Sequence, residues 1–365
     1  MDMPESTGVT RSDIEIRRGC SESAAGETAK LAVIITCFNY EAFVERAIRS
    51  VLEQMRDDCE LVVVDDGSTD GSWEAITRRG VRAFRIGNRG QLGACIYGLD
   101  RTRAPFVLFL DADDELKPGS LGAIVGELDE HVAKLQFALT LIDAQDNRIG
   151  AFSSLDAFRD RERLLEEVLG RGVYKTPPTS GNVFRRDLCE LLREVDYDRA
   201  VDGVILFAAP LFGEVVSLSE ELGLYRVHGR NDSRLGQIPS AAILERDINR
   251  FVARTEHLRN VVQRLAPGRQ LVESRKAFYY RERKFCLDIV SGDRPRLTAL
   301  PMLLISLLTE PYPLKAKLGM VGFFVLGSVL PSERAKKLLA YRSKNGERSA
   351  LGFAREFFSL SCADR

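Results

Sequence analysis

Three aspartates, at positions 111, 113 and 114, form the cluster in this sequence that most suggests chemistry. They stand in the segment Asp111-Ala-Asp-Asp114, directly after the apolar run Phe106-Val-Leu-Phe-Leu110. Side chains two apart on an extended segment point to the same side, so we expect Asp111 and Asp113 to share one ligand while Asp114 points away. Carboxylate oxygens suit Mg²⁺ or Mn²⁺, and such an ion would neutralise the charge on a pyrophosphate leaving group. The same spacing also occurs in ordinary solvated turns, so position must decide between the two.

Two further polar clusters follow apolar runs in the same way. Leu61-Val-Val-Val64 leads into Asp65-Asp-Gly-Ser-Thr-Asp-Gly71, and Leu31-Ala-Val-Ile-Ile35 leads into Thr36-Cys-Phe-Asn39, with helical spacing at 41–55. Short β-branched runs are typical of buried strands. Alternating strands and helices predict an α/β fold with a mostly parallel central sheet and helices on both faces. Ligands bind such sheets beyond the carboxyl ends of the strands, where all three polar clusters fall.

Four motifs, taken in order along the chain, resemble a known family. They are Val33-Ile-Ile-Thr-Cys-Phe-Asn-Tyr40, Val64-Asp-Asp-Gly-Ser-Thr-Asp-Gly71, Asn88-Arg-Gly-Gln-Leu-Gly93 and Phe109-Leu-Asp-Ala-Asp-Asp114. From about Leu31 to Leu116 they resemble the donor half of a family 2 glycosyltransferase with the GT-A fold. The resemblance implies inverting transfer of a sugar from a nucleoside-diphosphate donor, UDP or dTDP, to an acceptor hydroxyl, with Mn²⁺ or Mg²⁺ as cofactor.

The same resemblance assigns roles within the donor half. It implies that Thr36 and Asn39 line the nucleotide pocket, that Asp65 and Asp66 contact the base side, and that Asp111 and Asp113 hold ribose, pyrophosphate and metal. Thr36 departs from the family, which commonly has Pro at this position. Asn88 matches the segment before the metal strand, and it either contacts the nucleotide or belongs to a glycine turn that starts a helix.

The acceptor half carries a second resemblance. Thr179-Ser-Gly-Asn-Val-Phe-Arg-Arg186 resembles the family's acceptor-side segment, and Leu224-Tyr-Arg-Val-His-Gly229 resembles its closing Tyr-Arg-x-His segment. Between them the family carries an acidic general base, and Asp202 stands at that place, with Asp196 and Asp198 as rivals. A carboxylate that takes the proton of the attacking hydroxyl lowers the barrier, and a single displacement inverts the anomeric carbon.

Several cationic side chains near these segments have two interpretations. His228 either contacts metal or pyrophosphate or fills a structural hydrogen-bonded role, and Arg226 or Arg230 could add positive charge beside the leaving group. Arg185 and Arg186 either meet an anionic acceptor or form ordinary surface ion pairs.

Composition and the resemblance together divide the chain into three parts. Residues 1–30 lack apolar periodicity, which predicts a mobile leader, and the helical spacing in 239–365 predicts a helical C-terminal region. For 31–238 the resemblance implies a GT-A catalytic domain, with the donor half at 31–116 and the acceptor half at 117–238. Two apolar segments lie near 297–308 and 318–330. Between Arg294 and Lys344 nine Lys or Arg face two Glu. This pattern predicts either a helix pair buried in a protein core or peripheral contact of 294–344 with an anionic membrane.

Composition excludes other classes of protein. Lys plus Arg total 52 and Asp plus Glu 53, so we expect no nucleic-acid partner. The seven scattered cysteines predict reduced thiols in the cytoplasm, and no secretory signal opens the chain. Neither a dinucleotide-binding Gly-x-Gly-x-x-Gly nor a phosphate-binding loop is present. We therefore expect a cytoplasmic enzyme, free or at the inner face of a membrane, that glycosylates a glycan or lipid-linked acceptor of the cell envelope. A sugar nucleotidyltransferase and an inactive sugar-nucleotide or polysaccharide binding module are the alternatives.

Overall fold

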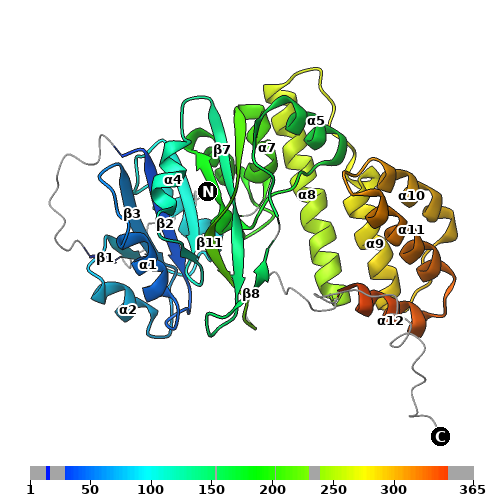
Figure 1. Ribbon diagram of the computed structural model, residues 1–365, viewed down its shortest axis with the longest axis horizontal. Coiled ribbons are helices and arrows are strands. Elements are labelled where there is room, and N and C mark those ends of the chain that lie inside the picture. The colour runs from blue at the N-terminus through cyan, green and yellow to red at the C-terminus, as the bar shows by residue number, and fades with distance from the viewer. Residues whose placement is uncertain (1–13, 17–28, 153, 202, 230–238, 344–365) are drawn as a thin grey trace, which may run out of the picture. The chain divides into compact units, whose positions relative to one another are not determined.

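The computed structural model describes residues 14–16, 29–152, 154–201, 203–229 and 239–343. The chain forms two compact units (Figure 1). The first unit comprises Met1–Glu166 and Tyr174–His228, and the second comprises Glu167–Val173 and Gly229–Arg365. The predicted donor half falls within the first unit, and so does the predicted acceptor half apart from Glu167–Val173 and the residues from Gly229 on. The separate functions of the two halves stay a prediction.

The first unit is built on one sheet of eleven strands in the order β1-β4-β3-β2-β5-β10-β7-β11-β6, with β8 paired to β7 and β9 to β11. The strands are β1 (Ile14–Ile16), β2 (Leu31–Cys37), β3 (Cys59–Asp65), β4 (Ala83–Arg85), β5 (Phe106–Asp111), β6 (Glu115–Leu116), β7 (Val132–Ile142), β8 (Arg148–Ala151), β9 (Phe158–Asp160), β10 (Asn182–Arg185) and β11 (Glu214–Arg226). The predicted α/β fold is therefore confirmed.

Strand direction decides which side chains meet at one edge of the sheet. β2 runs parallel to β3 and β5, and β3 parallel to β4. β10 is antiparallel to both β5 and β7, whereas β7 and β11 are parallel to each other. As a result β2, β3, β5, β7 and β11 all end at the same edge. The three polar clusters predicted from the sequence follow β2, β3 and β5, so all of them lie at this edge. The segment after β11 begins at the same edge.

The helices of the first unit lie against this sheet (Figure 1). The helices of this part of the chain are α1 (Val44–Leu52), α2 (Ser72–Arg78), α3 (Gly90–Leu99), α4 (Ser120–Gly126), α5 (Glu162–Arg171), α6 (Arg186–Cys189) and α7 (Val204–Phe212). On α3, Ala94 and Tyr97 pack in one cluster with Val62 and Val64 of β3. The run of β2 is buried along almost its whole length, as expected for a strand covered on both faces.

The second unit consists of helices that share one apolar cluster. They are α8 (Ala241–Leu265), α9 (Phe278–Ser291), α10 (Leu300–Leu308), α11 (Leu314–Val329) and α12 (Ser332–Ser343). Phe285 of α9 and Phe324 of α11 meet edge to face at 5.1 Å between ring centroids, and all five helices contribute to the cluster. The predicted C-terminal helices are thus present. Within the described chain, none of the helices combines the length and apolar character needed to cross a membrane.

Gly67 sits where two loops of the first unit come closest. Its φ is +77°, and a Cβ there would lie 3.0 Å from the backbone nitrogen of Asn88 and 3.1 Å from the carbonyl oxygen of Ile86. Gly80 has a similar φ of +64° but no atom within 4 Å of the corresponding position. The pair therefore separates the cost of the left-handed backbone from the cost of crowding.

We expect Gly67→Ala to destabilise the protein more than Gly80→Ala. Both changes force a side chain into the left-handed region, which costs about 1–2 kcal/mol, and only Gly67→Ala also displaces the loop at Asn88. Urea unfolding of the two variants measures the difference. Equal losses of stability would show that the close approach of the two loops has no energetic consequence.

Candidate active site

Three carboxylates gather where β5 ends. Asp111 closes the strand, and one oxygen from each of Asp111, Asp113 and Asp114 lies within 4.8 Å of the others. The expectation that Asp114 points away is wrong. The Asp114 N–H donates to the Asp111 carbonyl oxygen at 3.0 Å, so the chain turns after the strand instead of continuing extended. This turn folds the third carboxylate back onto the first two.

Asp114 is the most deeply buried member of this cluster. Burial first, and then the negative charges of Asp113 and Asp111, hold the pKa of its carboxyl well above the usual range. Its Oδ1 accepts the backbone N–H of Arg226 at 3.0 Å, whereas its buried Oδ2 accepts no hydrogen bond from the described residues. A buried oxygen beside two other carboxylates fits a divalent cation, which would supply the missing positive charge. The residues present therefore match the donor set that such an ion requires.

Two neighbours of Asp111 were not singled out from the sequence. Gln91 Nε2 donates to Asp111 Oδ1 at 2.7 Å, and the backbone N–H of Asp111 donates to Ser180 Oγ at 3.2 Å. Both residues belong to motifs that the sequence analysis quotes, at 88–93 and 179–186. Their place inside these motifs is the one signal in the sequence that could have marked them as site residues. The contact with Asp111 itself depends on the order of the strands in the sheet.

His228 reaches the carboxylate cluster from the segment after β11. Its Nε2 lies 2.9 Å from Asp113 Oδ2, and its ring stacks on Phe43 with centroids 5.3 Å apart and planes 13° from parallel. Tyr40 meets the same imidazole edge-on at 5.8 Å. The structure thus brings together His228 and Asp113, as the sequence predicts, and a direct role toward metal or pyrophosphate stays a prediction.

Arg226 holds the loop beneath the carboxylates. Its side chain is completely buried, its Nε donates to the Asp113 carbonyl oxygen at 3.0 Å, and it forms ion pairs with Glu115 and Asp146. These contacts fix the turn that carries Asp113. They favour an anchoring role over the predicted role beside a leaving group, and Arg230 lies outside the described residues.

Asp65 ends β3 and Asp66 follows it, and β2 lies between β3 and β5 in the sheet. Asp65 has no exposed surface, and its Oδ2 pairs with Arg85 Nε at 3.2 Å. Asp66 Oδ1 accepts the backbone N–H of Arg89 at 2.7 Å. Burial raises the pKa of both carboxyls above the ordinary value. Buried acidic groups at a strand end are typical of functional sites, in agreement with the predicted place of the nucleotide.

Asn39 adopts a conformation that asparagine tolerates better than most residues. Its φ is +60°, its Oδ1 accepts the backbone N–H of Thr69 at 2.7 Å, and its own N–H donates to Ser68 Oγ at 2.9 Å. These bonds tie the loop after β2 to the loop after β3. Left-handed non-glycine residues concentrate at ligand-binding sites, because the surrounding structure must enforce them.

Thr36 and Asn88 flank the same region. Thr36 lies directly opposite Asp111 in the pairing of β2 with β5. Asn88 is exposed, and its Oδ1 accepts the backbone N–H of Gly90, where α3 begins. The geometry therefore places Thr36 beside the cluster and gives Asn88 the helix-start contact that the sequence left open as an alternative.

Arg185 and Arg186 lie at the opposite edge of the sheet. Because β10 is antiparallel to β5, Arg185 pairs with Phe106 at the beginning of that strand. Arg186 donates to the carbonyl oxygens of Ala104 and Leu99. The structure does not bring either arginine to the carboxylate cluster.

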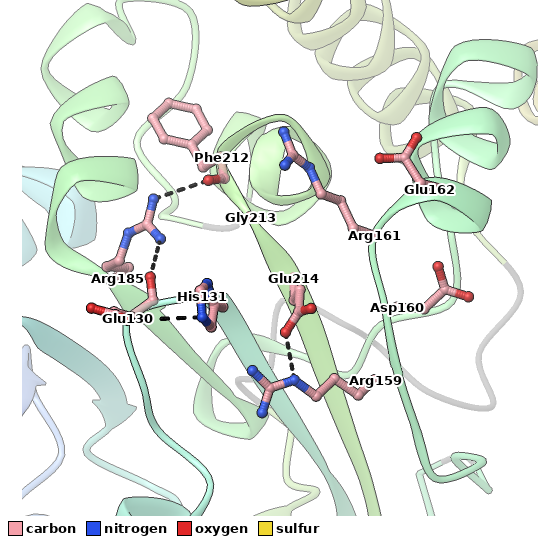
Figure 2. A pocket seen from close by; sticks show the side chains of 10 residues that line it. All are labelled: Glu130, His131, Arg159, Asp160, Arg161, Glu162, Arg185, Phe212, Gly213 and Glu214. Atoms are coloured by element: carbon pink, nitrogen blue, oxygen red, sulfur yellow. Dashed lines mark hydrogen bonds and ion pairs between the residues drawn. The ribbon is translucent and has the colours of Figure 1, made fainter.

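A pocket of about 520 Å³ opens at this opposite edge, and Figure 2 shows the side chains around it. Arg185 donates there to the carbonyl oxygen of Phe212 at 3.0 Å and pairs with Asp187, while Arg159 pairs with Glu214. Both of these arginines of the pocket are thus paired with carboxylates or backbone carbonyl oxygens. Nothing in this arrangement favours an anionic ligand over the groups already present.

Asp202, the predicted base, lies outside the described residues. The chain before it can be followed to Val201, and the Arg199 carbonyl oxygen accepts the backbone N–H of Leu92 at 2.7 Å. Leu92 is next to Gln91, which binds Asp111. The rival Asp198 accepts the N–H groups of the two residues that follow it, which is the role of a turn residue.

The buried carboxylate of Asp65 predicts a pH dependence of stability. Because its pKa is higher in the folded chain than the ~3.9 of an unfolded one, the folded protein holds this proton more tightly. Its contribution is most favourable at low pH and is lost as pH rises through the folded pKa. Asp65→Asn, which carries no such proton, should show a shallower loss of unfolding free energy from acid to neutral pH.

The same urea titrations on Asp57→Asn provide the control, because Asp57 is exposed. That variant should follow the wild-type profile. An Asp65→Asn profile that is parallel to the wild type would contradict the assigned cause.

Comparison with known proteins identifies the first unit. Residues 32–188 match the model of Glycosyl transferase family 2. An uncharacterized glycosyltransferase of Nostoc sp. is 36% identical over 214 residues, which are 56% of this chain and 66% of that protein. The GalNAc(5)-diNAcBac-PP-undecaprenol beta-1,3-glucosyltransferase of Campylobacter jejuni is 31% identical over 168 residues, 44% of this chain and 53% of that protein. The alignments thus span between half and two thirds of these relatives.

Among solved structures, TarS 1–349 of S. aureus in complex with UDP-GlcNAc aligns over 86% of both chains, with a TM-score of 0.49 and 19% identity. The four motifs of the donor half all lie inside the segment that the family model matches. The predicted resemblance is therefore confirmed, and this chain is a member of glycosyl transferase family 2.

Proposed function

We propose that this protein is an inverting, metal-dependent glycosyltransferase that moves a sugar from a UDP or dTDP donor to an acceptor hydroxyl. The observation that carries the proposal is the buried cluster of Asp111, Asp113 and Asp114 at the edge where the parallel strands end. The buried Asp65 and Asp66 stand at the end of β3, which β2 separates from β5, and the base and ribose would lie there. These features support a nucleotide-sugar site in a chain of this family.

The described residues divide the work of donor binding. Asp111, Asp113 and Asp114 would hold a divalent ion, which when bound supplies positive charge to the pyrophosphate. Gln91 and Ser180 orient Asp111 through its side chain and its backbone N–H. Loss of the hydrogen bonds from Gln91 or to Ser180 is expected to leave Asp111 less firmly held. Transfer would then be slower, because the reacting groups must be kept in a narrow geometry.

Asp202 is the residue we assign as general base. It would take the proton of the acceptor hydroxyl as that oxygen attacks the anomeric carbon, and the nucleoside diphosphate would leave from the opposite face. The assignment is supported by its place between the two acceptor-side segments of the family. The bond from Leu92 to Arg199 adds support, because it fastens the preceding chain near Gln91.

We further propose a lipid-linked or other cell-envelope glycan as acceptor, and the cytoplasm as the compartment. The Campylobacter relative is named as a glucosyltransferase of a PP-undecaprenol-linked glycan, which supports an acceptor of this class. Buried free thiols at Cys37 and Cys189 support a reducing compartment.

Metal binding is tested directly by thermal unfolding with and without Mn²⁺. Wild-type protein should be stabilised by ~2.7 kcal/mol when Mn²⁺ reaches 100 times its dissociation constant. Asp113→Asn should lose most of this stabilisation, because it removes one charge from the cluster, while exposed Asp57→Asn should keep it. A Mn²⁺ response that is unchanged in Asp113→Asn would place the metal elsewhere.

The base is tested by Asp202→Asn, assayed for transfer and for donor binding. Transfer should fall by about two orders of magnitude or more, because no group accepts the proton, while donor affinity stays near that of the wild type. Asp198→Asn is the matched control and should retain transfer. If instead Asp198→Asn is the inactive variant, the base has been assigned to the wrong residue. If the wild type binds a nucleotide sugar but transfers nothing, the sugar-nucleotide binding module replaces the proposal. If it binds no nucleotide sugar, the polysaccharide-binding module is the alternative that remains.

A further inference from the structure

Helices α10 and α11 of the second unit are apolar on two sides. The inner side packs into the shared cluster through Leu307, Phe323 and Phe324. Side chains on the other side remain 56–73% exposed. We call this set the outer apolar face, and its members are Met302, Ile305, Leu308, Leu314, Leu318 and Val329.

The spacing of these residues shows that the exposure is systematic. Met302, Ile305 and Leu308 repeat every three residues along α10, and on α11 Leu314 and Leu318 are one turn apart. A helix at a water-exposed surface carries polar residues at such positions. From Leu318 to Val329 the sequence of α11 has no charged residue at all. Exposed apolar side chains that repeat in this way along two consecutive helices are typical of a binding surface.

In the segment from Arg294 to Leu330, which carries the outer apolar face, the exposed charged residues are basic. Arg294, Arg296 and Lys315 are exposed, and Lys317 is partly exposed. The one acidic residue between Arg294 and Leu330 is Glu310, which is 9% exposed. The solvent-facing charge of this segment is therefore positive.

We propose that the outer apolar face binds the surface of a bilayer that contains anionic lipids. Apolar side chains on a helix enter the boundary between head groups and acyl chains, while flanking Lys and Arg attract the anionic head groups. A second copy of the chain is a poorer partner. A two-fold contact would bring the exposed basic residues of the two copies together. The inference rests on the proposed function for its purpose, since a lipid-linked acceptor lies at such a surface.

Sedimentation of the full chain with vesicles tests this inference. The protein should bind mixed phosphatidylcholine–phosphatidylglycerol vesicles more tightly than vesicles of phosphatidylcholine alone. The double variant Met302→Gln/Leu318→Gln should bind at least about tenfold more weakly, because two apolar side chains no longer enter the lipid. Arg296→Gln/Lys315→Gln should lose most of the preference for anionic vesicles, since each basic residue contributes about fivefold.

Ile149→Gln is the matched control. Ile149 is 52% exposed on β8 of the first unit, so its replacement should leave vesicle binding unchanged. Equal weakening by Ile149→Gln and by Met302→Gln/Leu318→Gln would overturn the assignment to α10 and α11. A full chain that ignores both kinds of vesicle would also overturn it. In that case either a second copy of the chain or residues 344–365 would cover the outer apolar face. Light scattering would detect the dimer, and vesicle binding that appears after removal of residues 344–365 would identify that segment.

Transfer to a water-soluble acceptor separates this inference from the proposed function. The four substituted positions lie outside the candidate active site, so their variants should transfer as the wild type does. Vesicle binding without any transfer would sink the proposed function alone, and transfer without vesicle binding would sink the membrane inference alone.

Discussion

The first unit is organised around the need to hold three carboxylates within a few ångströms of one another in a buried place. Like charges at that separation repel strongly where the dielectric is low. The protein meets this cost partly with Arg226, whose backbone N–H binds Asp114 and whose guanidinium fixes the Asp113 carbonyl oxygen. Arg226 ends β11, which is three strands away from β5 in the sheet. The end of this distant strand therefore maintains the turn that presents Asp111, Asp113 and Asp114 together.

Rigid apolar strands make this arrangement possible. β2, β3 and β5 are buried along almost their whole length, so their ends are fixed by packing on both faces. The loops that leave them are then tied to one another, as the bond from Thr69 to Asn39 shows. Packing in the core and hydrogen bonds in the loops thus act at different levels. The strands set where the loops start, and the loops set where the polar atoms lie.

The second unit is held together by packing between helices and contains no sheet in its described residues. Its helices bury one apolar side in a shared aromatic cluster, which suffices to hold them together. The remaining apolar side of α10 and α11 stays exposed and belongs to a segment whose exposed charged residues are basic. A surface so costly to leave in water is easiest to understand as a binding surface.

Local patterns in the sequence determined the strands and the acidic strand ends of this protein. The apolar runs before Asp65 and Asp111 predict buried strands, because continuous burial needs continuous apolar side chains. Tertiary structure alone decided which of the predicted residues meet. Gln91 and Ser180 reach Asp111 because α3 begins, and the segment before β10 ends, at the edge where β5 ends, and no spacing along the chain records that. Arg185 and Arg186 lie at the far edge because β10 runs antiparallel to its neighbours, and strand direction follows from pairing partners rather than from the strand's own residues.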